Sequence, residues 1–101
     1  MTEIPQYKIG QFNSKHDVTE DQQFKALVEE VGELSEALYT DASDEAIAEE
    51  LADVLFVTRS LAELRDINVT AHLNDVIAEN NAKNSETDGQ KVTKDTVEQI
   101  R

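Results

Sequence analysis

The chain contains no cysteine, one proline and only three glycines in 101 residues. The lack of cysteine excludes disulfide frameworks, thiolate metal sites and cysteine nucleophiles. Because proline and glycine are the strongest helix breakers, their scarcity, together with stretches rich in Ala, Leu, Glu and Val, predicts an all-α protein. A chain of this length is enough for one compact domain and too short for two.

Long apolar runs and a targeting signal are also missing. No apolar stretch approaches the ~20 residues that a membrane-spanning helix needs. The first five residues, Met-Thr-Glu-Ile-Pro, have neither the basic nor the apolar region of a signal peptide. We therefore expect a cytoplasmic protein without a membrane partner.

Basic residues are few: 9 stand against 22 acidic residues, which gives a net charge of −13. Such a charge repels nucleic-acid backbones and attracts cations. One explanation is that some carboxylates bind a metal ion. The other is that an acidic surface keeps the protein soluble. A halophilic source would fit this explanation, because a high-salt cytoplasm screens the repulsion between the acidic side chains. A metal site needs only a few of the 22 acids, so both explanations can hold together.

Apolar residues at helical spacing predict three main helices. The expected helices span residues 19–40, 44–65 and 70–83. Residues 1–18 are expected to form an N-terminal arm or short helix, residues 19–83 the helical core, and residues 84–101 a polar tail. The sequence Thr19-Glu20-Asp21-Gln22 has the pattern of a capping box, and Ser43 is the expected N-cap of the next helix.

The helix at 44–65 is apolar on more than one side. Leu51 and Leu55 define its main face, whereas Ala46, Val57 and Leu64 lie roughly 120–140° round from Leu51 at 100° per residue. A helix that is apolar on two sides is usually buried on two sides. Since one small domain cannot cover both, we expect a homodimer at least.

Acidic residues three apart occur on both long helices. They are Glu30 and Glu33 on the first and Glu50 and Asp53 on the second. This spacing places each pair one turn apart on one side of its helix. If the helices pack antiparallel, the four carboxylates can converge on one divalent cation, and Mg²⁺ or Mn²⁺ prefers such oxygen ligands.

Chance is the alternative explanation, because acidic pairs arise easily among 22 acids. Gly32 favours the metal site. A glycine in the middle of a helix costs roughly 1 kcal/mol relative to alanine and usually marks the close approach of a neighbour. It lies between two of the candidate ligands.

The segments Glu29-Glu30-Val31-Gly32-Glu33-Leu34 and Glu50-Leu51-Ala52-Asp53-Val54-Leu55 together resemble the EExxE…ExxD signature of the MazG-type nucleotide pyrophosphohydrolases. The resemblance covers about residues 20–95. It implies a helical bundle of three main helices and short terminal helices, completed as a dimer or a dimer of dimers. It also implies Mg²⁺, or Mn²⁺, held by Glu30, Glu33, Glu50 and Asp53. Glu29 matches the first glutamate of the signature and is expected to act on a second metal or to position the attacking water.

The C-terminal part is similar to the ending of the branch related to phosphoribosyl-ATP pyrophosphohydrolase, in which Asn and Lys side chains face the nucleotide. The matching residues that we expect to bind the nucleotide are Asn80, Lys83, Lys91 and Lys94. Three of the six lysines of this acidic chain fall between residues 83 and 94, and this basic cluster is a candidate triphosphate clamp. The alternative is a solubilising tail, which the composition alone favours slightly. The chain departs from that pattern at Asp95, where Gly is frequent, and it lacks the usual Tyr…Pro ending.

The expected activity is the Mg²⁺-dependent hydrolysis of a nucleoside triphosphate to a monophosphate and pyrophosphate, with pool sanitation as one role. Three alternatives remain open at this point. They are a catalytically idle dimerisation module, a partner-binding acidic helical bundle such as an antitoxin-like or regulatory protein, and a hydrolase of phosphoribosyl-ATP or a related nucleotide.

Overall fold

Four helices make up residues 4–83, the part of the chain that this computed structural model describes, and no strand occurs among these residues. In chain order they are α1 (Gln6–Lys15), α2 (Glu20–Tyr39), α3 (Asp44–Leu64) and α4 (Val69–Asn81). The all-α prediction is therefore confirmed. Within the described residues, no helix is both long and apolar enough to cross a membrane.

Local sequence signals set the helix ends. Thr19 and Gln22 form the reciprocal capping box at the start of α2, with distances of 3.2 Å and 3.0 Å between the bonded atoms. The Ser43 hydroxyl accepts the Ala46 N–H at 3.2 Å and caps α3. Each cap satisfies backbone donors that have no partner within the first turn of a helix.

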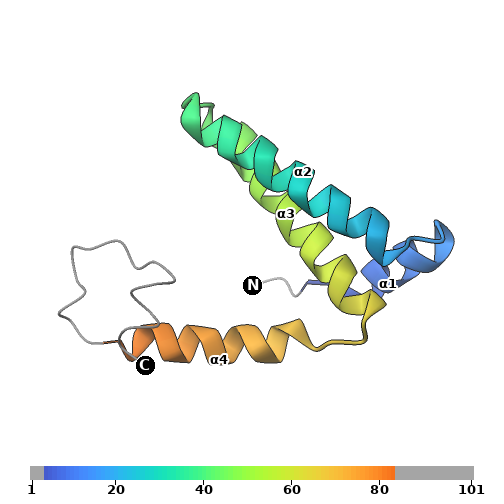
Figure 1. Cartoon of the computed structure of the whole chain (residues 1–101). Coiled ribbons are helices and arrows are strands. Elements are labelled where there is room, and N and C mark those ends of the chain that lie inside the picture. The colour runs from blue at the N-terminus through green and yellow to red at the C-terminus, as the bar shows by residue number, and fades with distance from the viewer. Residues whose placement is uncertain (1–3, 84–101) are drawn as a thin grey trace. The chain divides into compact units, whose positions relative to one another are not determined.

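The turns after α2 and α3 each contain an aspartate in the left-handed conformation. The φ angles are 54° at Asp41 and 55° at Asp66. Aspartate tolerates this conformation better than most residues with a side chain. The chain therefore reverses after α2, and Figure 1 shows α2 and α3 side by side and antiparallel.

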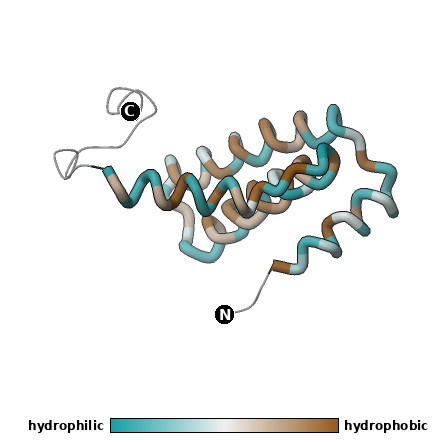
Figure 2. The backbone as a smooth tube through the Cα atoms, turned by 90° about the horizontal axis from the view of Figure 1, so that it is seen from below, coloured by the Kyte–Doolittle hydropathy of each residue, from teal (hydrophilic) through white to brown (hydrophobic). Residues whose placement is uncertain are grey.

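The first three helices belong to one unit, which extends to Asn68, and α4 belongs to a second unit that begins at Val69. Within the first unit, α3 packs against both α2 and α1. Hydrophobic and hydrophilic positions alternate along each helix (Figure 2), as expected for helices that each bury one side. The unit around α3 holds the acidic residues of the predicted metal site.

The helix faces that are buried differ in part from the predicted ones. Leu51 and Leu55, the predicted core face of α3, are 48% and 58% exposed, whereas Val57 is buried and Val54 half-buried. On α2, Phe24 and Val31 are exposed. Among the described residues, the least exposed positions of α2 recur every three or four residues; they are Gln23, Ala26, Leu27, Glu30, Leu34 and Ala37. The buried side of α2 thus includes one of the candidate metal ligands.

A buried polar network joins α1, α2 and α3. The Ser60 hydroxyl accepts from Gln23 Nε2 at 2.8 Å and donates to Asn13 Oδ1 at 2.6 Å. Asn13 Nδ2 also donates to the Ser60 carbonyl oxygen at 3.1 Å. Ser60 is fully buried, and Asn13 and Gln23 are nearly so. These bonds satisfy groups that would otherwise be costly to bury.

Replacing Ser60 with alanine is expected to lower the free energy of unfolding by about 2 kcal/mol or more, because two buried polar groups lose a partner. Thr58→Ala is the matched control, since its hydroxyl bonds only to the Val54 carbonyl of its own helix. We expect a loss below about 1 kcal/mol there. Urea denaturation measures both variants, and equal losses would show that the network contributes nothing beyond an ordinary hydroxyl.

Candidate metal centre

Three glutamates of α2 contribute to an acidic cluster. Glu29, Glu30 and Glu33 each offer a carboxylate oxygen, and the three oxygens lie within 4.8 Å of one another. Glu30 is half-buried because it shares a side of the helix with Leu27 and Leu34, and Glu29 and Glu33 are exposed. The cluster therefore has an inner carboxylate towards α3 and two outer ones towards solvent.

Two acids of α3 meet the inner glutamate. Oxygens of Glu30, Glu50 and Asp53 also lie within 4.8 Å of one another. The antiparallel packing of α2 and α3 brings these side chains together although 20 residues separate Glu30 from Glu50 in the sequence. The structure thus brings together all five acidic residues that the sequence analysis selected, since Glu30 belongs to both groups.

The inner carboxylates lack partners. Glu30 Oε2 and Glu50 Oε2 are buried and have no hydrogen-bond partner among the described residues. Burial, followed by the charges of Glu33 and Asp53, raises the pKa of Glu30 from 4.5 to about 7. Burial first, and then the charges of Glu33, Asp53 and Glu49, also raises the pKa of Glu50. The cluster therefore has a deficit of positive charge at its centre.

This donor set fits a divalent cation. Hard cations such as Mg²⁺ and Mn²⁺ bind carboxylate oxygens, and a cation would supply the missing partner of both buried oxygens. It would also remove the repulsion that raises the two pKa values. Within residues 4–83, the two groups that share Glu30 are the candidate metal-binding clusters.

The expected reason for Gly32 is not found among residues 4–83. A Cβ atom built on Gly32 would meet no atom of the described residues within 4 Å. The prediction that a neighbouring element of the fold approaches this glycine is therefore wrong for the described unit. The backbone between Glu30 and Glu33 is instead open on this side.

Gly32→Ala is consequently expected to raise the free energy of unfolding by about 0.5–1 kcal/mol, because alanine has the higher helix propensity and meets open space. Thermal or urea unfolding of the metal-free protein measures this change. A loss of stability would show that another molecule, such as a second copy of the chain, contacts Gly32 in solution.

The four residues predicted to bind the nucleotide follow the first unit in the sequence. Asn80 and Lys83 belong to the second unit, where the Lys83 ammonium donates to Asn80 Oδ1. Lys91 and Lys94 lie outside the described residues. The described site consists of the five carboxylates of α2 and α3.

Sequence reasoning missed how deeply two of these carboxylates are buried. The spacing of the acidic pairs does not itself indicate burial, whereas Glu30 and Glu50 both lie half-buried where α2 packs against α3. One signal was available: Leu27, Glu30 and Leu34 follow one another at spacings of three and four, which places the glutamate within an apolar stripe.

Comparison with known families agrees with this geometry. Residues 18–91 match the model of the MazG nucleotide pyrophosphohydrolase domain. The match includes all five carboxylates and most of the chain, so the protein belongs to the MazG family. It therefore carries a domain of a class of hydrolases that act on nucleotide pyrophosphate bonds. Searches of curated proteins and of solved structures each found no match.

Proposed function

We propose that the protein is a Mg²⁺-dependent nucleoside triphosphate pyrophosphohydrolase that converts a (d)NTP to a (d)NMP and pyrophosphate. The observation that carries this proposal is the convergence of carboxylates from α2 and α3 around two buried oxygens without partners. Glu30, Glu33, Glu50 and Asp53 hold the ion, with Mn²⁺ as an alternative. When bound, the ion offsets phosphate charge and acidifies water.

In the proposed reaction, a water oxygen bonds to the α-phosphorus and the bond to the α,β-bridging oxygen breaks. The outer carboxylate Glu29 accepts a hydrogen bond from that water and orients it. Asn80 contacts the sugar or base, and Lys83, Lys91 and Lys94 bind the phosphates of the leaving pyrophosphate. These lysines supply positive charge that a chain of net charge −13 otherwise lacks.

The test is an assay of pyrophosphate release from a panel of the common NTPs and dNTPs, with Mg²⁺, with Mn²⁺ and with a chelator. The proposal predicts release that needs the metal, with equal amounts of monophosphate and pyrophosphate. No release from any triphosphate, but release from phosphoribosyl-ATP, would favour the related branch. Metal binding without turnover of either substrate class would identify a non-catalytic module.

We also propose that the chain forms at least a homodimer. Six large apolar residues of the helical pair are 44–61% exposed and form one stripe on each helix: Phe24, Val28, Val31 and Leu38 on α2, and Leu51 and Leu55 on α3. At 100° per residue, the exposed stripe of each helix is rotated by about 105° from the buried side of that helix. The direction of this rotation, viewed along the helix axis, is the same for α2 and α3. Because the helices are antiparallel, both stripes face the same side of the pair.

Glu33 and Asp53 are rotated by about 70–75° from the buried sides of their helices, in the direction opposite to the apolar stripes. The other side of the helical pair therefore bears the carboxylates. An apolar surface of this extent on a small domain is typical of an interface between proteins. A second copy that covers the apolar stripes would leave the carboxylate side accessible to substrate.

Light scattering during gel filtration tests the dimer. We expect a mass of twice 11.3 kDa or a higher multiple, and a shift to the monomer for Val28→Glu. Gln11→Glu is the matched control, because it adds the same charge at an exposed position of α1. A monomeric unsubstituted protein, or equal dissociation of both variants, would contradict the proposed interface.

A further inference from the structure

The ring of Phe56 lies on α3 one turn after Asp53, a member of the acidic cluster. At 100° per residue, the two side chains are rotated by about 60° from each other. Residues three apart on a helix are neighbours, with Cβ atoms about 5–6 Å apart. Phe56 is 38% exposed, so part of its ring is accessible. The acidic cluster therefore has an accessible aromatic ring beside it.

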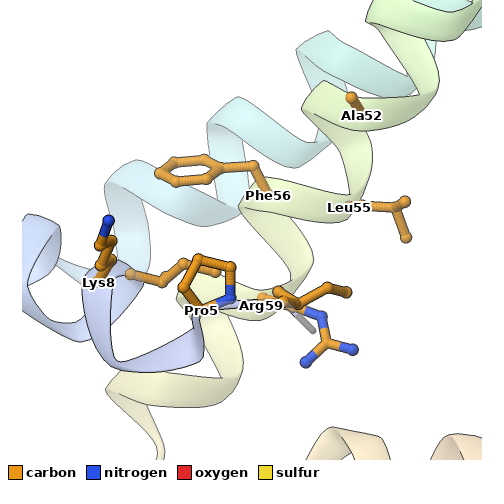
Figure 3. A pocket seen from close by; sticks show the side chains of 8 residues that line it. Pro5, Lys8, Ala52, Leu55, Phe56 and Arg59 are labelled. Atoms are coloured by element: carbon orange, nitrogen blue, oxygen red, sulfur yellow. The ribbon is translucent and has the colours of Figure 1, made fainter. Parts of the chain in front are cut away.

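Phe56 does not belong to the apolar stripes of the proposed dimer interface. It is rotated by about 100° from Leu55 and by about 140° from Leu51, the two stripe residues of α3. Figure 3 shows that the side chains of Phe56 and Leu55 leave α3 on different sides of the helix. A second copy can therefore cover the stripe without covering the ring of Phe56.

The first helix holds the ring of Phe56 in place. The rings of Phe12 and Phe56 meet edge to face, with centroids 5.0 Å apart and planes at 80°. The ring of His16 lies next to Phe12, with centroids 4.7 Å apart. Since Asn13 of α1 bonds to Ser60 of α3, the two helices are fixed to each other at this point. Phe56 is thus supported by α1 in a defined position.

Aromatic side chains are few in this chain, which has three phenylalanines, two tyrosines and no tryptophan. The other four are Phe24 in the apolar stripe of α2, Phe12 and Tyr7 on α1, and Tyr39 at the last position of α2. Of these five residues, only Phe56 lies within one turn of a clustered carboxylate on its own helix. An aromatic contact to a molecule at the cluster is therefore expected from Phe56 first.

We propose that the base of the bound nucleotide stacks on Phe56, and that this ring distinguishes nucleotides from phosphate chains without a base. The inference rests on the proposed function, because the ion at the acidic cluster is what holds the phosphates. One sugar joins the base to the α-phosphate, so a nucleotide with its phosphates at Asp53 extends to the next turn of α3. A flat, uncharged base meets an apolar ring there, and every base has a face that can stack.

Tryptophan fluorescence tests the stacking directly, because the chain has no tryptophan of its own. The full-length Phe56→Trp variant is titrated, with Mg²⁺, with the α,β-methylene analogues of the common nucleoside triphosphates, in which the bond that would break cannot be hydrolysed. We expect at least one analogue to quench the emission when it binds. Inorganic triphosphate, which has three phosphates and no base, should bind without quenching, and chelation of Mg²⁺ should abolish the quenching by the analogue.

Tyr39→Trp is the control for this measurement. Tyr39 is 92% exposed and ends α2, outside both groups of clustered carboxylates. A tryptophan there has the same intrinsic emission without the position beside Asp53. The emission of this variant should not change with any analogue.

Affinity supplies a second measurement. Phe56→Leu keeps apolar bulk against Phe12 but removes the aromatic ring, so it should weaken the best analogue about fivefold or more. The affinity for inorganic triphosphate should change less than about twofold, because its phosphates do not contact the ring. Calorimetry measures both ligands, and circular dichroism checks that the helices are kept.

Several results would overturn the stacking role. They are a loss of affinity that is equal for the nucleotide analogue and for inorganic triphosphate, binding of the analogues without quenching, and quenching that persists without Mg²⁺. Hydrolysis of a triphosphate with no effect at Phe56 would remove this role alone and leave the proposed function intact. Failure of both the analogues and inorganic triphosphate to bind would instead overturn the proposed function, and the stacking role with it.

Discussion

At pH 8 and without divalent metal, Glu30→Gln is expected to unfold at a higher urea concentration than the unsubstituted protein. The folded-state pKa of Glu30 is about 7, against 4.5 for an ordinary glutamate. Between these values the folded state binds more protons than the unfolded state, so the stability of the unsubstituted protein falls as the pH rises through this window. Glutamine cannot ionise, so the variant lacks the part of this fall that Glu30 causes.

Comparison of pH 4 with pH 8 provides the check. The advantage of the variant should be small at pH 4, where Glu30 is protonated in both states, and largest above pH 7. Glu36→Gln is the matched control, because it removes one charge from an exposed residue of the same helix that lies outside the two metal-binding groups. If Glu30→Gln lowers the stability at pH 8, the buried carboxylates are not in repulsion.

Addition of Mg²⁺ or Mn²⁺ should reverse this order. A ligand that binds only the folded state stabilises it by about 2.7 kcal/mol at 100 times its Kd. The unsubstituted protein should gain this stability, whereas Glu30→Gln, which lacks an inner ligand, should gain much less. A metal-dependent gain that is equal in both proteins would place the ion elsewhere.

The second large effect is expected on turnover. Glu33→Ala and Asp53→Ala should each lower pyrophosphate release by about 10²–10³-fold, because a bound metal supplies several kcal/mol of charge stabilisation in the transition state. Both variants should keep the fold or gain stability, since each loses a repulsive charge near Glu30. The measurement is kcat/KM for the best substrate of the triphosphate panel, with Mg²⁺ held constant.

Glu36→Ala is the control for Glu33→Ala. It lies one turn further along α2, is equally exposed and belongs to neither acidic group. We expect less than a twofold change in kcat/KM. Unchanged turnover of Asp53→Ala would contradict the proposed metal site, whereas equal losses in Glu36→Ala would indicate a general charge effect.

The helices and their ends were predictable because their signals are local. The capping box of Thr19 and Gln22 and the N-cap Ser43 depend on residues three positions apart, and both form as predicted. The polar turn around Asp41 and the break at Asp66 are also local. The acidic pairs were identified from spacing and from the MazG resemblance, and the antiparallel packing of α2 and α3 brings them together.

The choice of the buried side was not predictable in the same way. Because α3 is apolar on more than one side, periodicity alone could not tell whether Leu51 or Val57 faces the chain interior. The position of the neighbouring helices decides this, and it leaves Leu51 48% exposed and Val57 6% exposed. Residues 6–15 were also hard to assign, because α1 is held by polar contacts of Gln6 and Asn13 that hydrophobic periodicity does not reveal.

The polar attachment of α1 has a consequence for how the helix can move. A helix that is held only by apolar side chains can shift by one turn along its neighbour and replace one set of apolar contacts with another. A slide of α1 would leave the buried amide of Asn13 without its partners and the Ser60 O–H without an acceptor, at a cost of about 1–3 kcal/mol for each group. We therefore expect the first helix to keep one register against α3 or to detach as a whole, rather than to shift by steps along it.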